Sequence, residues 1–347
     1  MLGAGRPWLN VRPALFLGSN LVVAGGLLAW LAWQHGRPAL AVLGASPDAL
    51  GLIAAAGAAA TALGALALRW QVLLAGFAAH TSFSRLVAFR AAGQAVGAVV
   101  PSARLGGDPL RIWLLARART PPPLAIASVA IDRALEMGSS AGFTVFFALV
   151  LVSQHIPPLH GAVTAGMLGG VAVLAGLAIT GVRLRRHAGL VTALLHAVRL
   201  DRLRLVRSRM RLLEDAEALA RALVDQPRRL ARAFCLGVLS NALTPLEYWL
   251  LLSAFGLPSE PVAVVGAVFA TGAAHSMPVP AGIGVLEGAQ MGLFVLLGHP
   301  ADVGLAVGLA VRLRELLWVV PGLGVLALEL MRQARPAVPS RRPATDS

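Results

Sequence analysis

Long apolar runs separated by short polar segments dominate the chain. A helix needs about 20 apolar residues to cross about 30 Å of hydrocarbon. Six runs reach this length: Ala14–Trp33, Ala49–Leu68, Leu124–Val152, Ala162–Val182, Ala233–Phe255 and Val303–Met331. The pattern therefore predicts an all-α integral membrane protein with six full transmembrane helices.

Two further apolar stretches are broken by proline and paired glycines before they reach spanning length. The first break lies within Ala98–Pro121 and the second within Ser276–Glu287. Proline lacks an N–H and fixes φ, and glycine adopts dihedral angles that other residues avoid, so neither continues a helix comfortably. Within a membrane, such backbone is tolerated only where protein or a wet cavity satisfies it. We therefore predict two re-entrant helical pairs, a feature typical of transport sites when it recurs in both halves of a chain.

The placement of arginine predicts the orientation in the membrane. With both termini in the cytoplasm, the inside segments hold 26 of the 30 basic residues, and the outside turns hold only Arg37. This agrees with the positive-inside rule, and it makes the two re-entrant pairs open to opposite sides, as in an inverted repeat. We predict one polytopic membrane domain, residues 1–331, which contains a basic cytoplasmic loop at 183–232. A disordered cytoplasmic tail is predicted at 332–347.

Composition supports the membrane assignment and argues against several classes of function. The chain is 57% hydrophobic and 13% charged, with a mean hydropathy of +0.74 and a net charge of +14. A soluble domain is about 25% charged. The positive charge is spread over loops rather than gathered in a soluble basic domain, so no nucleic-acid partner is expected. The histidines and the single cysteine form no known ligand motif, and no catalytic motif is apparent, so we expect no metal, no cofactor and no enzyme activity.

Eight charged residues fall within the predicted spans or directly after the second break. They are Asp132, Arg133, Glu136, Glu247, Glu287, Arg312, Arg314 and Glu315. Each costs about 2.5–3.5 kcal/mol if it faces lipid, and eight would cost roughly 24 kcal/mol, more than the ~5–15 kcal/mol net stability of a typical protein. They must pair, line a wet cavity or lie at the membrane rim. Structural pairing and a polar pathway for a charged substrate both remain open.

Spacing suggests how some of these charges are arranged. Asp132 and Glu136 are four residues apart and share one helical face, and Arg312 and Glu315 are three apart. Leu124–Val152 is longer than the hydrocarbon is thick, so we expect Asp132, Arg133 and Glu136 near the rim.

The first break has the features of an anion site. Asp108 followed by Pro109 resembles a helix N-cap and first helical residue, which points the positive helix end at Gly106 and Gly107. Arg104 and Arg111 flank this turn. A helix N-terminus with two guanidinium groups suits phosphate. The Asp108 carboxylate could instead neutralise the turn, which would make it purely structural. The preceding segment, Arg69–Arg90, mixes arginine with apolar residues and predicts an interfacial helix.

The second break contains Pro280, Gly282 and Gly284, and Glu287 follows in the first turn of the next helix. The helix dipole favours a carboxylate there. With no arginine nearby in the sequence, we interpret this loop as structural or cation-facing. His275 is either a proton-relay residue or a loop histidine whose hydrogen bonds are satisfied.

These motifs, in this order, resemble the flippase-like family named for the transmembrane region of lysylphosphatidylglycerol synthase. The matching pieces are Pro101-x-x-Arg104-x-Gly-Gly107-Asp108-x-x-Arg111, Asp132-Arg133-x-x-Glu136, Pro278-x-Pro-x-Gly-x-Gly284-x-x-Glu287 and the Arg312 helix. The resemblance implies an all-helical protein of the bacterial inner membrane that moves or binds polar lipids. The family includes the membrane part of the bacterial multiple peptide resistance factor, which also has a soluble aminoacyl-transferase domain. No part of this sequence could be that domain, so lysyl-lipid synthesis is not expected.

Two main hypotheses follow. The chain is a lipid transporter whose substrate-binding residues are Arg104, Gly106, Gly107, Asp108, Arg111, Asp132, Arg133, Glu136, Glu247, Pro280, Gly282, Gly284, Glu287, Arg312 and Glu315. Alternatively, it is a non-transporting subunit that presents lipid to, or scaffolds, a separate lipid-modifying enzyme through the 183–232 loop. A third hypothesis is a proton-coupled carrier of a small anion that uses the carboxylates as relays.

Overall fold

The structure, a computed structural model, describes residues 33–44, 47–77, 81–99, 105–154, 157–186, 209–277 and 282–334, with a few single positions between them. Its regular elements in these ranges are all helices, which confirms the all-α prediction. The predicted span Ala14–Trp33 and the tail after residue 334 lie almost entirely outside the described residues.

Four helical stretches among the described residues are long and apolar enough to cross a membrane. They are Ala49–Phe77, Pro122–Ser153, Pro157–Arg186 and Pro227–Ala254. They contain α2 (Ala49–Leu74), α5 (Pro122–Ser153), α6 (His160–Arg186) and α10 (Pro227–Ala254). The predicted last span is also a continuous helix, α13 (Ala301–Ala334), but its middle carries Arg312, Arg314 and Glu315, and it is not among these four.

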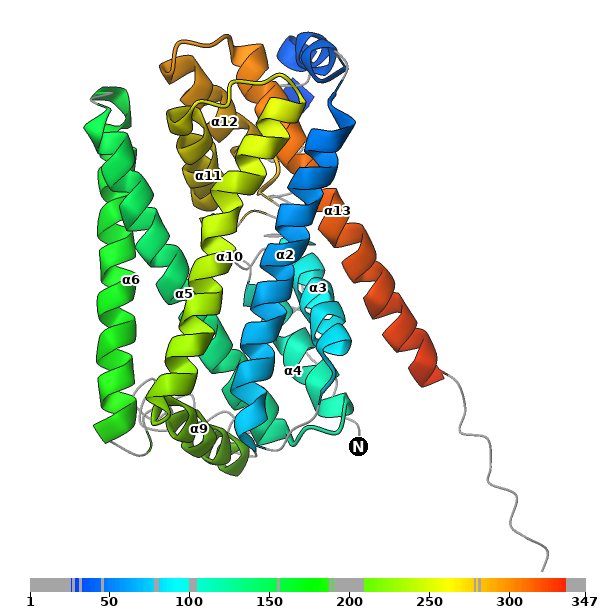
Figure 1. The fold of residues 1–347 in the computed structure, drawn as a ribbon, viewed down its shortest axis with the longest axis vertical. Helices are drawn as coiled ribbons and strands as arrows, with labels where there is room; N and C mark the ends of the chain where they lie inside the picture. Colours follow the sequence, from blue (N-terminus) through cyan, green and yellow to red (C-terminus); the bar gives the residue numbers. More distant parts are fainter. Residues whose placement is uncertain are drawn as a thin grey trace, which may run out of the picture.

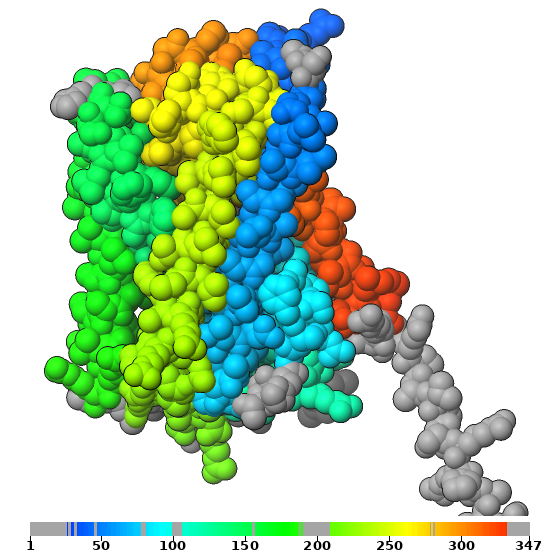
Figure 2. All heavy atoms as spheres, in the orientation of Figure 1, coloured from blue at the N-terminus to red at the C-terminus, as the bar shows by residue number. Residues whose placement is uncertain are grey.

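Helices α2 and α10 run antiparallel along the length of the molecule and close one face of it (Figures 1 and 2). The N–H of Asp48, which caps α2, donates to the carbonyl of Ala254 at the end of α10, at 2.8 Å. Helices α5 and α6 form a hairpin beside them, and α9 (Met210–Val224) lies across its lower end (Figure 1). Arg221 Nε of α9 donates to the carbonyl of Leu184 on α6 at 2.9 Å, which fixes α9 to this end.

The two sequence breaks separate two short helical pairs. Helices α3 (Phe83–Val99) and α4 (Asp108–Arg117) lie in the lower half of the bundle, and α11 (Pro261–Ser276) and α12 (Val285–Leu296) lie in the upper half (Figure 1). At 1.5 Å per residue, each is shorter than the ~30 Å of hydrocarbon. The order α2-α3-α4-α5 is repeated as α10-α11-α12-α13, and the short pairs face opposite ends. This agrees with the predicted inverted repeat.

One expectation about the first half was wrong. Arg69–Arg90 does not form an interfacial helix. Helix α2 continues through Arg69 and Trp70 to Leu74, and α3 begins at Phe83. The side chains of Arg69 and Arg90 are buried, and they form ion pairs with a carboxylate on α5.

Close backbone contact holds the first short pair together. A Cβ on Gly107 would overlap the backbone of Gly93, so the start of α4 packs directly on α3. Because the obstructing atoms are backbone, we expect Gly107→Ala to reduce the free energy of unfolding by about 1–3 kcal/mol, measured as a lower melting temperature in detergent. The matched control is Gly142→Ala on α5, where a Cβ would meet nothing within 4 Å. That change should be neutral or stabilising by up to about 1 kcal/mol. Equal effects in the two variants would contradict the packing argument.

Candidate functional site

A buried carboxylate on α5 lies at the centre of the first charged cluster. Asp132 is fully buried and accepts hydrogen bonds from three arginines. Arg69 Nε donates at 2.6 Å, Arg90 Nη1 at 2.7 Å and Arg111 Nη2 at 2.5 Å. These arginines come from α2, α3 and α4, so one side chain holds three helices against α5.

Glu136 lies one turn further along α5 and faces the same way. It accepts from Arg69 Nη2 at 3.1 Å, from Arg90 Nη2, and from Arg133 Nη1 at 3.2 Å. The predicted shared face of Asp132 and Glu136 is confirmed, because both carboxylates bind the same two arginines. The arginines of three helices cover Asp132 completely; that these residues lie near the membrane rim stays a prediction.

The accessible edge of the cluster consists of Asp108, Arg133 and Glu136. Their side chains are 20%, 21% and 28% exposed. Asp108 accepts from Arg111 Nη1 at 3.3 Å and lies 3.8 Å from Arg133 Nε. Arg111 itself is covered, with its guanidinium 4.4 Å from the ring centroid of Trp70.

The first cluster carries a surplus of positive charge. Among the described residues it contains four arginines and three carboxylates, which leaves one positive charge uncompensated. Four buried donors there also have no hydrogen-bond partner in the described part of the chain: Arg69 Nη1, Arg90 Nε, Arg111 Nε and Arg133 Nε. A buried, unpaired donor is costly, so the cluster favours an additional acceptor.

A second cluster lies where the short pair α11–α12 meets α13. Arg314 of α13 forms two hydrogen bonds to buried Glu247 of α10, one of them 2.7 Å from Nη2 to Oε2. Arg312 Nε donates to Glu287 at 2.7 Å, and Arg312 Nη1 donates to Glu315 at 2.9 Å. The predicted pairing of Arg312 with Glu315 is confirmed.

Three expectations about the second break had different outcomes. Glu287 Oε2 accepts from the N–H of Gly284 at 2.8 Å, in the first turn of α12 as predicted. The expectation that Glu287 has no arginine nearby was wrong, because α13 brings Arg312 to it from 25 residues away. His275 is not in a loop but in the last turn of α11, and its Nε2 lies 2.8 Å from Oε1 of Glu315.

The two clusters have opposite charge surpluses. The second contains three carboxylates and two arginines, counted over the described part of the chain, which leaves one negative charge when His275 is neutral. Corresponding positions in the two halves carry charges of opposite sign. Arg69 lies 20 residues after Ala49 at the start of α2, and Glu247 lies 20 residues after Pro227 at the start of α10. Arg69 binds a carboxylate on the long helix that ends its half, whereas Glu247 binds an arginine on the corresponding helix.

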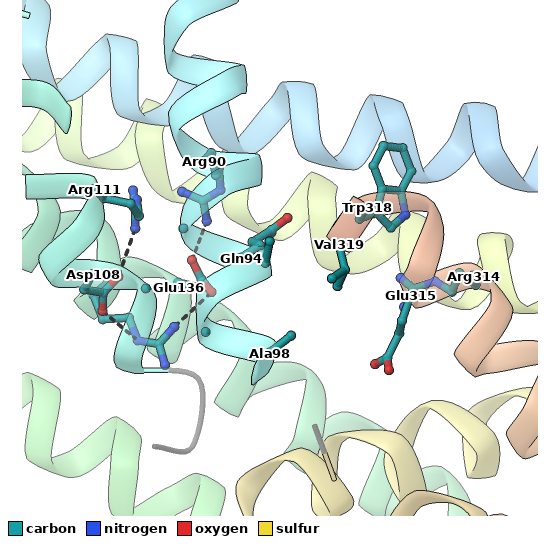
Figure 3. A pocket seen from close by; sticks show the side chains of 15 residues that line it. Arg90, Gln94, Ala98, Asp108, Arg111, Glu136, Arg314, Glu315, Trp318 and Val319 are labelled. Carbon is teal, nitrogen blue, oxygen red and sulfur yellow. Dashed lines mark hydrogen bonds and ion pairs between the residues drawn. The ribbon is translucent and has the colours of Figure 1, made fainter. Parts of the chain in front are cut away.

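A cavity of about 170 Å³ separates the two clusters. Residues of α3, α4 and α5 form one wall and residues of α13 form the other (Figure 3). The first wall presents Arg133, Asp108 and Glu136, with Arg90 and Arg111 behind them and Gln94 beside them, and the opposite wall presents Arg314, Glu315, Trp318 and Val319. Such a cavity has room for on the order of ten water molecules, or for a small polar headgroup.

Several predicted site residues lie elsewhere. Arg104 and Pro280 are outside the described residues. Gly107, not Asp108, is the N-cap of α4, and no side-chain cap hydrogen bond forms there. Arg111 does not flank an open turn, because its guanidinium donates hydrogen bonds to Asp108 and Asp132. The remaining residues away from the cavity belong to the second break and its partners: Glu247, Gly282, Gly284, Glu287 and Arg312.

The comparisons with known proteins agree with this architecture. Residues 19–324 match the family model described as the lysylphosphatidylglycerol synthase TM region. The chain belongs to this family. No curated protein matches the chain. Membership in the family, together with the apolar helices, identifies a multi-pass membrane protein related to lipid modification or flipping.

Proposed function

We propose that this protein binds the phosphate-bearing headgroup of a membrane lipid in the cavity and moves it across the bacterial inner membrane, without catalysing a reaction on it. Both termini are cytoplasmic in this proposal. The observation that carries it is the positive wall: counted over the described residues, its cluster has one uncompensated positive charge and four buried guanidinium N–H groups without a hydrogen-bond partner. A charge in such a place is costly, and an anionic ligand offsets that cost.

The accessible edge determines which residues meet the headgroup. Arg133 is the most exposed arginine of the positive cluster, at 21%, whereas Arg69, Arg90 and Arg111 are nearly covered. Arginine binds phosphate through paired N–H groups. In the proposal Arg133 contacts the phosphate directly, and the buried arginines supply the positive potential behind it.

The acyl chains stay outside the cavity. Helix α13 packs against α3 on one side, with Gly322 in close contact with Ala91, and its last turns extend away from the bundle (Figure 1). Its apolar side chains Leu316, Leu317, Val320 and Leu323 are between 42% and 63% exposed. In a bilayer this surface contacts lipid tails, so a headgroup can occupy the cavity while its tails remain in the membrane. Rocking of the two repeats about the cavity would expose it to each side in turn.

The direct test is Arg133→Gln in liposomes. We expect headgroup translocation to slow by about ten- to a hundredfold, because a hydrogen bond to a charged group contributes about 1.5–3 kcal/mol. The assay follows fluorescent phospholipids in proteoliposomes after a membrane-impermeant quencher is added. The matched control is Arg117→Gln, because Arg117 is an exposed arginine of α4 that does not line the cavity. Equal rates in the wild type and in Arg133→Gln would remove this residue from the mechanism.

A second candidate function is the lipid-presenting or scaffolding subunit. It is favoured by a groove near the lower ends of α2 and α10, with a volume of about 590 Å³, lined by Arg228, Arg229 and Arg232. A basic groove of this kind fits an anionic surface of a partner enzyme. In that case glutamine at these three arginines would abolish partner capture, while Arg133→Gln would have no effect.

A further inference from the structure

The groove at the lower ends of α2 and α10 is a second basic site. The two helix ends lie side by side (Figure 2), and the groove between them has a volume of about 590 Å³. Arg228, Arg229 and Arg232 of α10 line it, together with Val72 and Ala75 at the end of α2. Over the described residues, its lining contains no carboxylate and shares no residue with the cavity. Its positive charge is therefore separate from that of the first cluster.

The arginines of this groove lie where a helix disfavours positive charge. Arg228 and Arg229 are in the first turn of α10, which contains no acidic residue and has no side-chain cap hydrogen bond. A helix N-terminus carries partial positive charge, so it repels cations and attracts anions. In the part of the chain that the structure describes, none of the three arginines forms an ion pair. An anion in the groove would offset this unfavourable arrangement of charge.

The side chain of Arg229 is held in place without a ligand. Its Nη1 donates a hydrogen bond to Oε1 of Gln226, the residue before α10. Its guanidinium also lies against the turn that follows α2, at Gly76. A Cβ at Gly76 would overlap Nη1, so only glycine leaves room for the guanidinium in this position. A side chain that is already ordered loses less conformational freedom when it binds a ligand.

The groove lies at the depth of lipid headgroups. Helices α2 and α10 have 26 and 28 residues, which makes them about 39 and 42 Å long. The hydrocarbon of a bilayer is about 30 Å thick, and the headgroup regions bring the total to about 40–45 Å. The ends of both helices therefore reach the headgroups. A lipid can enter the groove from within its own leaflet, with its chains along α10, where Phe234 is 40% exposed. This position favours a lipid over a soluble partner protein.

We propose that this groove binds an anionic phospholipid of the leaflet at the lower end of the bundle. Arg228 and Arg229 bind the phosphodiester through their guanidinium groups, and the acyl chains follow the exposed side of α10. The lipid stays bound and is not the one that is moved, so this proposal does not rest on transport through the cavity. The groove should select phosphatidylglycerol over phosphatidylcholine, whose ammonium group cancels the charge of its phosphate.

A fluorophore on Cys235 reports on this lipid locally. Cys235 is the only cysteine of the chain, and it is exposed. It lies three residues after Arg232 on the same face of α10, and about 9 Å along the helix axis from Arg229, which is the depth of the acyl chains. The labelled protein is reconstituted in phosphatidylcholine vesicles that contain a small fraction of either phosphatidylglycerol or phosphatidylcholine with brominated acyl chains. Bromine quenches the fluorophore on contact, so quenching measures which lipid occupies this surface.

For the wild type we expect phosphatidylglycerol to bind at least about fivefold more tightly than phosphatidylcholine, because one arginine near an anionic surface contributes about that factor. In the double variant Arg228→Gln/Arg229→Gln this preference should fall to about one. The matched control is Arg85→Gln/Arg117→Gln, which removes two exposed arginines outside the groove. It should retain the preference of the wild type.

Gly76→Ala tests the geometry of the groove without changing its charge. The added Cβ displaces the guanidinium of Arg229, which is the flexible end of a side chain, so the fold should tolerate the change. We expect the preference for phosphatidylglycerol to fall by about two- to fivefold. The matched control is Gly57→Ala on α2, where a Cβ would meet nothing within 4 Å, and its preference should equal that of the wild type.

Each of the contrary results would overturn the proposal. Equal quenching by the two brominated lipids in the wild type means that no anionic lipid is bound, and it leaves the groove to the anionic surface of a partner enzyme. An equal loss in the two double arginine variants means that net charge, and not the groove, attracts the lipid. Full preference in Gly76→Ala means that the arginines act as a diffuse positive surface.

Discussion

Replacing Asp132 with asparagine is expected to remove about 3–5 kcal/mol from the free energy of unfolding. The carboxylate is fully buried and is shared by Arg69, Arg90 and Arg111. Removing one partner from a buried ion pair leaves uncompensated charge in a medium that cannot solvate it, which is far more costly than losing a surface pair. Here three guanidinium groups lose their common acceptor at once.

The effect should appear as a melting temperature lower by on the order of 10 °C, measured as the loss of monodisperse protein after heating in detergent. The matched control is Asp215→Asn on α9, because Asp215 is exposed. That change should stay within about 0.5 kcal/mol. A similar small effect at Asp132 would mean that the arginines find other acceptors and that the carboxylate is not the centre of the cluster.

Arg314→Gln is expected to have the second large effect, a loss of about 3 kcal/mol or more. It leaves Glu247, whose side chain is 3% exposed, without its arginine. Tyr248 also loses the guanidinium that lies 5.2 Å from its ring centroid. The expected loss comes from the buried, unpaired Glu247 carboxylate and not from lost packing. Glu247→Gln in the same chain should therefore restore much of the stability.

A double-mutant cycle tests this directly. Melting temperatures of both single variants, the double variant and the wild type give the coupling between the two side chains. Arg232→Gln, at an exposed arginine, controls for the general effect of removing a positive charge. If the stability losses of the two single variants simply add in the double variant, the loss does not come from leaving Glu247 buried without its arginine.

Much of the architecture could be predicted because apolar length and helix-breaking residues are local signals. The length of the apolar runs was enough to predict α2, α5, α6 and α10. The glycine and proline breaks predicted the positions of both short helical pairs. The element boundaries were less predictable. The sequence Asp108-Pro109 is a normal N-cap signature, yet α4 begins one residue earlier than expected, and Asp108 turns to Arg111 and Arg133 instead of capping the helix.

The site was only half predictable, because its contacts are distant in the sequence. Arg69 and Asp132 are 63 residues apart, and Arg90 and Asp132 are 42 apart. One usable signal was overlooked. The eight embedded charges recognised from the sequence are five carboxylates and three arginines, so two more cations had to be buried nearby. Arg69 and Arg90 meet that requirement. The cavity residues Gln94 and Trp318 carry no such signal, because only the packing of α13 against α3 places them there.

The sequence distances within each cluster also bear on how the protein is made. The ion pairs of the first cluster join residues of α2, α3, α4 and α5, and those of the second join residues of α10, α11, α12 and α13. Synthesis proceeds from the N-terminus, and completed units fold first. The buried arginines of the first half therefore meet all their carboxylates as soon as α5 has left the ribosome. Among the described residues, each repeat can therefore be inserted with its own ion pairs formed, and only the one surplus charge of each cluster remains uncompensated within its half.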